Sequence, residues 1–280
     1  MDRPEASGGH ICKSVYISNN QNVYQKVFEP VALDELDNSL FMKRYETKYL
    51  FSPEILHSVL DGLADSYRII SINNHFLQDY ETLYFDTPDF KFYLDHQNGK
   101  LNRYKVRFRK YPVSESMFVE IKFKNNKNQT EKWRKEITKK NYSRGVITDQ
   151  ENRFINTYFK NDSGYLTPRL TIAYSRLAFI HKRDRERITI DLDLSYSKGS
   201  DGKSFSNLSI AEVKQETLSH RSSFSRIMRE LRIQPMRFSK YCFGIYQFYP
   251  LLKYNRFKPR YTFIQRISDD NTPYQENESD

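Results

Sequence analysis

The chain has 280 residues, of which 38% are hydrophobic and 29% charged, which suits one folded domain rather than a disordered polymer. Its two cysteines, the lack of an apolar run of roughly 18–20 residues and a start unlike a signal peptide argue against a disulfide scaffold and a transmembrane segment, so we expect a cytoplasmic protein. The net charge of +10 predicts an anionic partner, for which nucleic acid and a membrane surface are the common candidates.

The N-terminal part shows no clear hydrophobic period, and residues 1–32 are expected to be an extension before one domain at 33–250. Strands with alternating polar and apolar residues are predicted at 41–51, 80–87, 103–111, 118–125 and 130–138. A helix begins at Pro53, with Ser52 as its N-cap, and runs to about Asp65. A second helix is predicted at 89–97, where Asn98-Gly99 ends it.

A helix near 149–160 separates these strands from a second set. The strands of that set are predicted at 169–180, 185–194 and 208–216. Residues 195–207, rich in Ser and Gly, are expected to form a flexible loop. A helix at 222–233 follows, 239–249 fits a helix or a strand, and 251–280 is expected to be a tail.

Charged residues occupy every second position of most predicted strands, and residues two apart on a strand share a face. Four cations of 103–111 therefore lie on one side of that strand: Arg103, Lys105, Arg107 and Arg109. The other strands group their charged residues in the same way: Arg44, Glu46 and Lys48; Glu120, Lys122 and Lys124; Lys132 and Arg134; Arg185, Arg187, Asp191 and Asp193; Glu212 and Lys214.

For any single strand, a solvated outer face of a sheet explains this alternation well. Six strands with the same basic face are harder to explain in that way. Two like charges about 6 Å apart repel by roughly 3 kcal/mol at an effective dielectric constant near 20. Such a concentration of cations is favourable where a polyanion neutralises it. Nucleic acid is disfavoured as this polyanion, because the basic residues follow strand faces and exposed aromatic stacking platforms are not evident.

The carboxylates on the same faces suggest a divalent metal. Mg²⁺ or Mn²⁺ commonly binds a triphosphate through phosphate oxygens and one or two carboxylates. The candidate ligands are Glu46, Glu120, Asp191, Asp193 and Glu212, and the alternative for each is a salt bridge to a neighbouring Lys or Arg. The sequence contains no P-loop, no Rossmann fingerprint and no zinc-type spacing of Cys or His. With these sites excluded, the remaining mechanism is electrostatic positioning of the substrate, and phosphoryl transfer needs little else.

The motifs RYETKY, YFDT, NGKLNRYKVRFRKY, VEIKFK, TEKWR, YSRLAF, ERITIDLDL, AEVK and FSKYCFG occur in that order between about Leu33 and Phe248. Their order and spacing closely resemble the VTC-type polyphosphate polymerase domain of the triphosphate tunnel metalloenzymes, which are relatives of the CYTH phosphatases and cyclases. The resemblance implies an α+β fold, an eight-stranded antiparallel β-barrel that forms a tunnel with flanking helices, and polar faces that point inward.

The resemblance also implies roles for individual residues. The expected phosphate contacts are Lys48, Arg107, Arg109, Lys122, Lys132, Arg134, Arg176, Arg187, Lys214 and Lys240. Glu212 is expected to hold the metal. Arg103, Lys105 and Lys124 share the basic faces and are expected to help bind the nucleotide. Tyr174 and Tyr241 lie beside these motifs, and core packing explains them equally well.

One departure concerns the first strand, where the wider superfamily carries ExExK and Arg44 occupies the position of the first Glu. This argues against a two-metal hydrolytic site and favours the polymerase branch. Eukaryotic polymerases of this type also carry a phosphate-sensing helical domain and a membrane anchor. Neither is recognisable here, so the sequence itself implies no regulation or export, and a membrane partner protein stays open.

The leading hypothesis is a polyphosphate polymerase that uses ATP, Mn²⁺ or Mg²⁺ and inorganic polyphosphate, and that transfers the γ-phosphate to a growing chain with release of ADP. Two alternatives stay open: a hydrolase of tripolyphosphate or nucleoside triphosphates, and a non-catalytic sensor of polyphosphate or nucleotide. Direction of reaction, metal, primer and oligomeric state are not fixed by the sequence.

Overall fold

A computed structural model describes residues 21–36, 45–127, 129–159, 165–217 and 222–269. Within them, one large sheet contains eleven strands. The strands are β1 (Pro30–Ala32), β2 (Tyr45–Phe51), β3 (Tyr67–Ser71), β4 (Gln78–Asp86), β5 (Arg103–Tyr111), β6 (Ser116–Lys124), β7 (Thr130–Glu136), β8 (Thr167–His181), β9 (Glu186–Lys198), β10 (Asp201–Phe205) and β11 (Ser209–Gln215).

Eight of these strands form a continuous antiparallel path in the order β2-β11-β9-β8-β4-β5-β6-β7. This confirms the expected α+β fold with eight antiparallel strands. The path is not closed by pairing of β7 with β2 in the described part of the chain. Three strands lie off the path, and the pairing of β1 with β3 is parallel.

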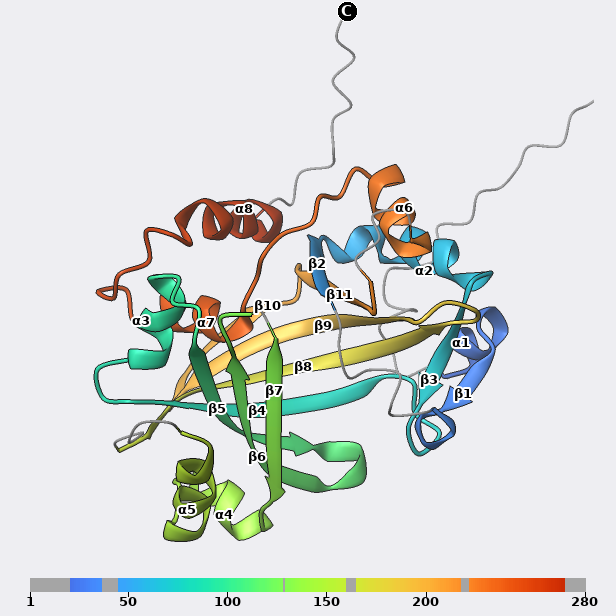
Figure 1. The fold of residues 1–280 in the computed structure, drawn as a ribbon. Coiled ribbons are helices and arrows are strands. Elements are labelled where there is room, and N and C mark those ends of the chain that lie inside the picture. Colours follow the sequence, from blue (N-terminus) through green and yellow to red (C-terminus); the bar gives the residue numbers. More distant parts are fainter. Residues whose placement is uncertain (1–20, 37–44, 128, 160–164, 218–221, 270–280) are drawn as a thin grey trace, which may run out of the picture.

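Helices surround the sheet (Figure 1). The α-helices are α1 (Gln21–Val27), α2 (Leu56–Ala64), α3 (Lys91–Gln97), α4 (Lys139–Arg144), α5 (Asp149–Tyr158), α6 (Ser223–Glu230), α7 (Lys240–Phe248) and α8 (Lys258–Asp269). Short 3-10 turns are η1 (Leu33–Glu35), η3 (Pro53–Ile55) and η4 (Pro112–Ser114). Local signals set several ends: the Ser52 hydroxyl accepts a hydrogen bond from the Glu54 amide (3.3 Å), and Gly99 takes the left-handed conformation after α3.

The outer face of the sheet is apolar and covered by helices. Leu177, Phe179 and Ile190 pack with residues of α2 and α6 in one cluster. Val106, Phe108 and residues of β6 pack with Ile155 of α5 in another. Figure 1 shows these two helix groups on opposite sides of the molecule. The alternating charged residues of the same strands therefore point to the inner face.

Helix α7 closes one end of that inner face. Tyr241 and Phe243 belong to an apolar cluster with Leu170 and Ile210, which lie on the inner side of β8 and β11. The Tyr241 hydroxyl also donates to buried Asp86 at the end of β4 (2.5 Å). Because α7 is anchored in this way, residues at its N-terminal end are fixed beside the charged face.

Three segments differ from the sequence-based expectation. Residues 195–207 are not a flexible loop, since they contain the end of β9 and strand β10, which form a hairpin at Gly199. The expected extension contributes α1 and β1, with buried Tyr24 and Phe28 packed in the core. The expected tail contains α8, whose Tyr261 and Ile264 pack in the cluster around α7. Strand β3 and helix α4 lacked a clear periodic signal.

Candidate functional site

The predicted basic faces of three neighbouring strands combine into one surface. Arg107 of β5 lies directly across from Glu120 of β6, and Glu120 lies across from Arg134 of β7. The next position along the strands aligns three lysines, Lys105, Lys122 and Lys132. Arg103 lies across from Lys124 at the end of this surface. The alternation in the sequence therefore predicted which residues of each strand share this face, and the structure supplies their neighbours across the strands.

Glu120 is the centre of the first charge cluster. Its side chain is 1% exposed, Arg107 Nη2 lies 2.6 Å from Oε2, and Lys132 Nζ lies 2.6 Å from Oε1. Burial alone would raise the pKa of Glu120, but Arg107, Arg109 and Lys132 hold it well below its usual range. Burial lowers the pKa of Lys132 to about 8 in spite of this partner. Glu120 is therefore a permanent carboxylate that holds cations in place.

Asp191 of β9 is the centre of the second cluster. It is almost fully buried and forms a two-pronged ion pair with Arg176 of β8, with 2.9 Å between Nη2 and Oδ2. Lys240, at the start of α7, contacts the same carboxylate. Burial opposes ionisation of Asp191, yet Arg176 and Lys240 lower its pKa to about 2. Helix α7 thus delivers a cation to the face formed by the strands.

Glu212 of β11 is the centre of the third cluster. Its oxygens lie 3.2 Å from Lys48 Nζ and 2.9 Å from Lys214 Nζ. Burial alone would raise the pKa of Glu212, but Lys214 and Lys48 keep it well below its usual value. Lys214 lies across from Glu46 on β2 and from Arg187 on β9, so both of these residues share this face.

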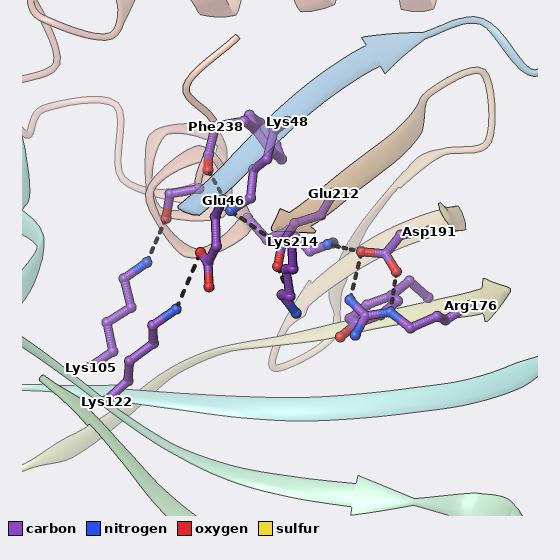
Figure 2. Close-up of polar contacts among 12 residues, drawn as sticks. Glu46, Lys48, Lys105, Lys122, Arg176, Asp191, Glu212, Lys214 and Phe238 are labelled. Atoms are coloured by element: carbon purple, nitrogen blue, oxygen red, sulfur yellow. Dashed lines mark hydrogen bonds and ion pairs between the residues drawn. The ribbon is translucent and has the colours of Figure 1, made fainter. Parts of the chain in front are cut away.

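Contacts across the inner space connect the two ends of the strand path. Lys122 Nζ of β6 lies 3.8 Å from Glu46 of β2, and Lys105 Nζ of β5 donates to Ser239 Oγ before α7 (2.9 Å). Figure 2 shows Lys105 and Lys122 reaching toward the Glu46 and Lys48 side of the site. Burial lowers the pKa of Lys105 to about 8. The sheet therefore curls into a tunnel-like enclosure lined by charge.

Four other charged residues highlighted by the sequence do not lie at the centre of these three clusters. Arg109 is buried and donates to the Tyr174 hydroxyl (3.2 Å). Arg134 is exposed on the outermost strand of the path, and its guanidinium lies over the Phe118 ring at 4.9 Å. Two residues lie off the face. Asp193 has a positive φ of 52° and is exposed in a bulge of β9, and Arg185 pairs with Glu216 at the surface (3.1 Å).

Tyrosines form a layer of the site that the charge pattern did not reveal. The Tyr84 hydroxyl accepts from Arg107 Nη1 at 3.0 Å, and its ring stacks on Tyr241. Burial opposes ionisation of Tyr84, but Arg107, Lys105 and Arg109 lower its pKa to about 7. Tyr80 stacks on Tyr174 beneath Arg176. Tyr80 and Tyr84 are four residues apart in the 80–87 segment and therefore share a face of the strand, which was a usable signal.

The carboxylates predicted as metal ligands have different surroundings in the structure. Among the described residues, no three His, Cys, Asp or Glu side chains gather as a ready metal site. Glu120 and Asp191 are almost fully buried among cations, whereas Glu46 and Glu212, diagonal neighbours on β2 and β11, have side chains that are 29% and 17% exposed. These two can offer one carboxylate each, which suits a metal that arrives with phosphate oxygens. Arg44, the noted departure, lies outside the described residues.

The family comparison agrees with the sequence motifs. The model of the VTC domain matches residues 43–249. No match was found among curated protein sequences. Among solved structures, a candidate adenylate cyclase from Bacillus halodurans covers 74% of this chain and 97% of its own, with 14% identity and a TM-score of 0.48. A candidate adenylyl cyclase from Hippeastrum, for which a dominant triphosphatase activity is described, covers 76% of this chain and 99% of its own, with 13% identity and a TM-score of 0.45.

No helix in the described part of the chain is both long and apolar enough to cross a membrane.

Proposed function

Since this chain belongs to the VTC domain family, we propose that it is a metal-dependent polyphosphate polymerase that uses ATP. The observation that carries the proposal is the inner face itself. The four carboxylates there are outnumbered by cations, and the two most enclosed, Glu120 and Asp191, serve to position them. The surplus positive charge fits a chain of phosphates, and arginines present forked donors that match phosphate oxygens.

In this proposal the inner-face residues bind and orient two phosphate chains. Arg107 and Arg109, held by Glu120, and Arg176 and Lys240, held by Asp191, contact phosphate oxygens. A terminal oxygen of the acceptor chain attacks the γ-phosphorus of ATP, the bond from that phosphorus to the β-bridging oxygen breaks, and ADP leaves. No protein nucleophile takes part, because positioning and charge stabilisation supply the catalysis.

Glu46 and Glu212 are the residues that we propose to hold Mn²⁺ or Mg²⁺ together with the triphosphate. When bound, the metal offsets negative charge on the transferring phosphoryl group. Lys48 and Lys214, which pair with Glu212, would then also contact phosphate.

Incubation with ATP and Mn²⁺ or Mg²⁺, resolved by gel and by phosphorus NMR, tests the reaction. The proposal predicts ADP and polyphosphate chains in matched amounts. Orthophosphate without chains would show a hydrolase, and tight binding without turnover would show a sensor. Either result would overturn the polymerase assignment while leaving the phosphate-binding face in place.

A further inference from the structure

The row of cations on β5 continues beyond the inner face. Arg109, Arg107, Lys105 and Arg103 alternate along one side of the strand, so the row spans about 20 Å at roughly 3.3 Å per residue. A triphosphate held at the Glu120 and Asp191 clusters occupies only part of that length. The row ends at Arg103, beside α3 and the segments that flank α7.

Five cations from four parts of the chain gather at that end: Arg103, Lys124, Arg237, Arg256 and Arg260. Arg103 and Lys124 lie opposite each other on the neighbouring strands β5 and β6. Burial lowers the pKa of Arg103, and the positive charges of Arg256 and Arg237 lower it further. Burial also lowers the pKa of Arg260, and the positive charges of Arg237 and Arg256 lower it further. The Arg256 guanidinium also lies directly against the backbone of Gly99.

This gathering differs from the three internal clusters in one respect. None of its five cations forms an ion pair with a carboxylate among the residues that the structure describes. The nearby carboxylate of Asp95 is already shared by Lys91 (2.6 Å) and Lys100 (2.7 Å). Lys124 is partly offset by the carboxylate of Glu46. Like charges held together with so little compensation destabilise the free protein and favour an external anion.

We propose that Arg103, Lys124, Arg237, Arg256 and Arg260 form an outer binding surface for a phosphate chain that extends out of the tunnel. This inference rests on the proposed function and goes beyond it, because Arg256 and Arg260 lie outside the matched family domain. The ligand is a linear polyphosphate longer than the tunnel segment that binds the triphosphate. A short tripolyphosphate fills the inner clusters and does not reach this surface.

The test compares binding of tripolyphosphate, long-chain polyphosphate and a single-stranded oligonucleotide at several salt concentrations. The double variant Arg256→Gln/Arg260→Gln removes two charges of the surface. Lys140→Gln/Arg144→Gln is the matched control, since both residues are exposed on α4, far from α8 in Figure 1. Arg237→Gln serves as a second variant should the double variant melt at a lower temperature than the parent.

We expect about tenfold weaker binding of long polyphosphate and a salt slope reduced by about one to two. Binding of tripolyphosphate should change less than twofold, and the control should match the parent. Equal losses for both ligands, or none, would overturn the outer surface while the tunnel assignment stands. A comparable loss of oligonucleotide binding would assign the surface to nucleic acid. If the parent does not bind tripolyphosphate, the proposed function fails first, and the outer surface fails with it.

Discussion

Arg107 links stability and binding at the level of a single residue. Its guanidinium is paired with Glu120, whose side chain is 1% exposed, so Arg107→Ala leaves a buried carboxylate with only part of its compensation. We expect a loss on the order of 3 kcal/mol in the free energy of unfolding, together with a large loss of tripolyphosphate affinity. Urea denaturation and calorimetry measure the two effects.

Lys122→Ala is the matched control for that variant. Lys122 is 39% exposed on its side chain and its pair with Glu46 is looser, at 3.8 Å. Its removal should weaken tripolyphosphate binding yet change stability by less than about 1 kcal/mol. If Arg107→Ala proves as stable as Lys122→Ala, the buried charge of Glu120 does not need Arg107 for its compensation.

Tyr84 predicts a pH dependence. Its folded pKa of about 7 lies below the ordinary value near 10, so its ionisation stabilises the fold increasingly from about pH 7 to 10, and this contribution is lost as the pH falls through 7. The phenolate also removes net positive charge from the site, and Lys105 and Lys132 lose theirs near pH 8. Tripolyphosphate affinity should therefore fall above pH 7.

Tyr84→Phe keeps the aromatic ring and removes the titrating hydroxyl. Its affinity for tripolyphosphate should begin to fall only near pH 8, about one unit later than in the parent. Identical pH profiles for parent and variant would show that Tyr84 does not ionise in the site.

Glu212→Gln tests the metal assignment. With tripolyphosphate present, Mn²⁺ should bind the variant at least tenfold more weakly, because the amide is a poorer ligand than the carboxylate. Glu216→Gln is the control, since Glu216 is half-exposed and pairs with Arg185 outside the tunnel. An unchanged Mn²⁺ titration for Glu212→Gln would make Glu212 only a salt-bridge partner of Lys48 and Lys214.

At the scale of elements, α7 must lie very close to the sheet. A Cβ at Gly244 would come within 2.6 Å of the buried Tyr196 ring and 3.0 Å of Leu170. Overpacking typically costs 1–3 kcal/mol, more than the roughly 1 kcal/mol that Ala gains over Gly in a helix. Gly244→Ala should lower stability and, by displacing Lys240, weaken tripolyphosphate binding.

Gly202→Ala provides the comparison for Gly244→Ala. The nearest atom to a Cβ at Gly202 is the Tyr196 carbonyl oxygen, at 3.9 Å. Thermal melts should therefore show little change for Gly202→Ala and a clear decrease for Gly244→Ala. Equal melting temperatures would mean that α7 can move away from the sheet without loss of stability.

The elements of the site were predictable where a period of two was strong. The faces of β5, β6 and β11 follow directly from alternation, and the order of motifs indicated the VTC family. Strand β10 was missed because Gly199, Gly202 and several serines resemble a loop, although Gly199 only forms the hairpin turn. The alternation also failed at Asp193, where a bulge shifts the register.

The partners of each charge could not be read from the sequence. Lys240 reaches Asp191, and Lys105 reaches Ser239, through contacts between residues far apart in the chain. Which carboxylates are enclosed by cations depends on how the sheet curls and on where α7 enters it. The sequence therefore indicated which charged residues share a strand face, but not the division between Glu120 and Asp191 on one side and Glu46 and Glu212 on the other.

At the scale of the whole molecule, helices cover an apolar outer face and leave the cations facing inward. We expect such an enclosure to admit a slim phosphate chain and to exclude a polymer that carries bases. AMP, with one phosphate, would leave most of the inner cations uncompensated. Size and charge together should therefore select the ligand.

Competition against labelled ATP at fixed, near-physiological salt tests this central claim most directly, because salt weakens every such contact. Tripolyphosphate should displace ATP far better than AMP or a single-stranded oligonucleotide of equal charge. If the oligonucleotide displaces ATP as effectively as tripolyphosphate does, the binding face lies outside the tunnel and the account is wrong.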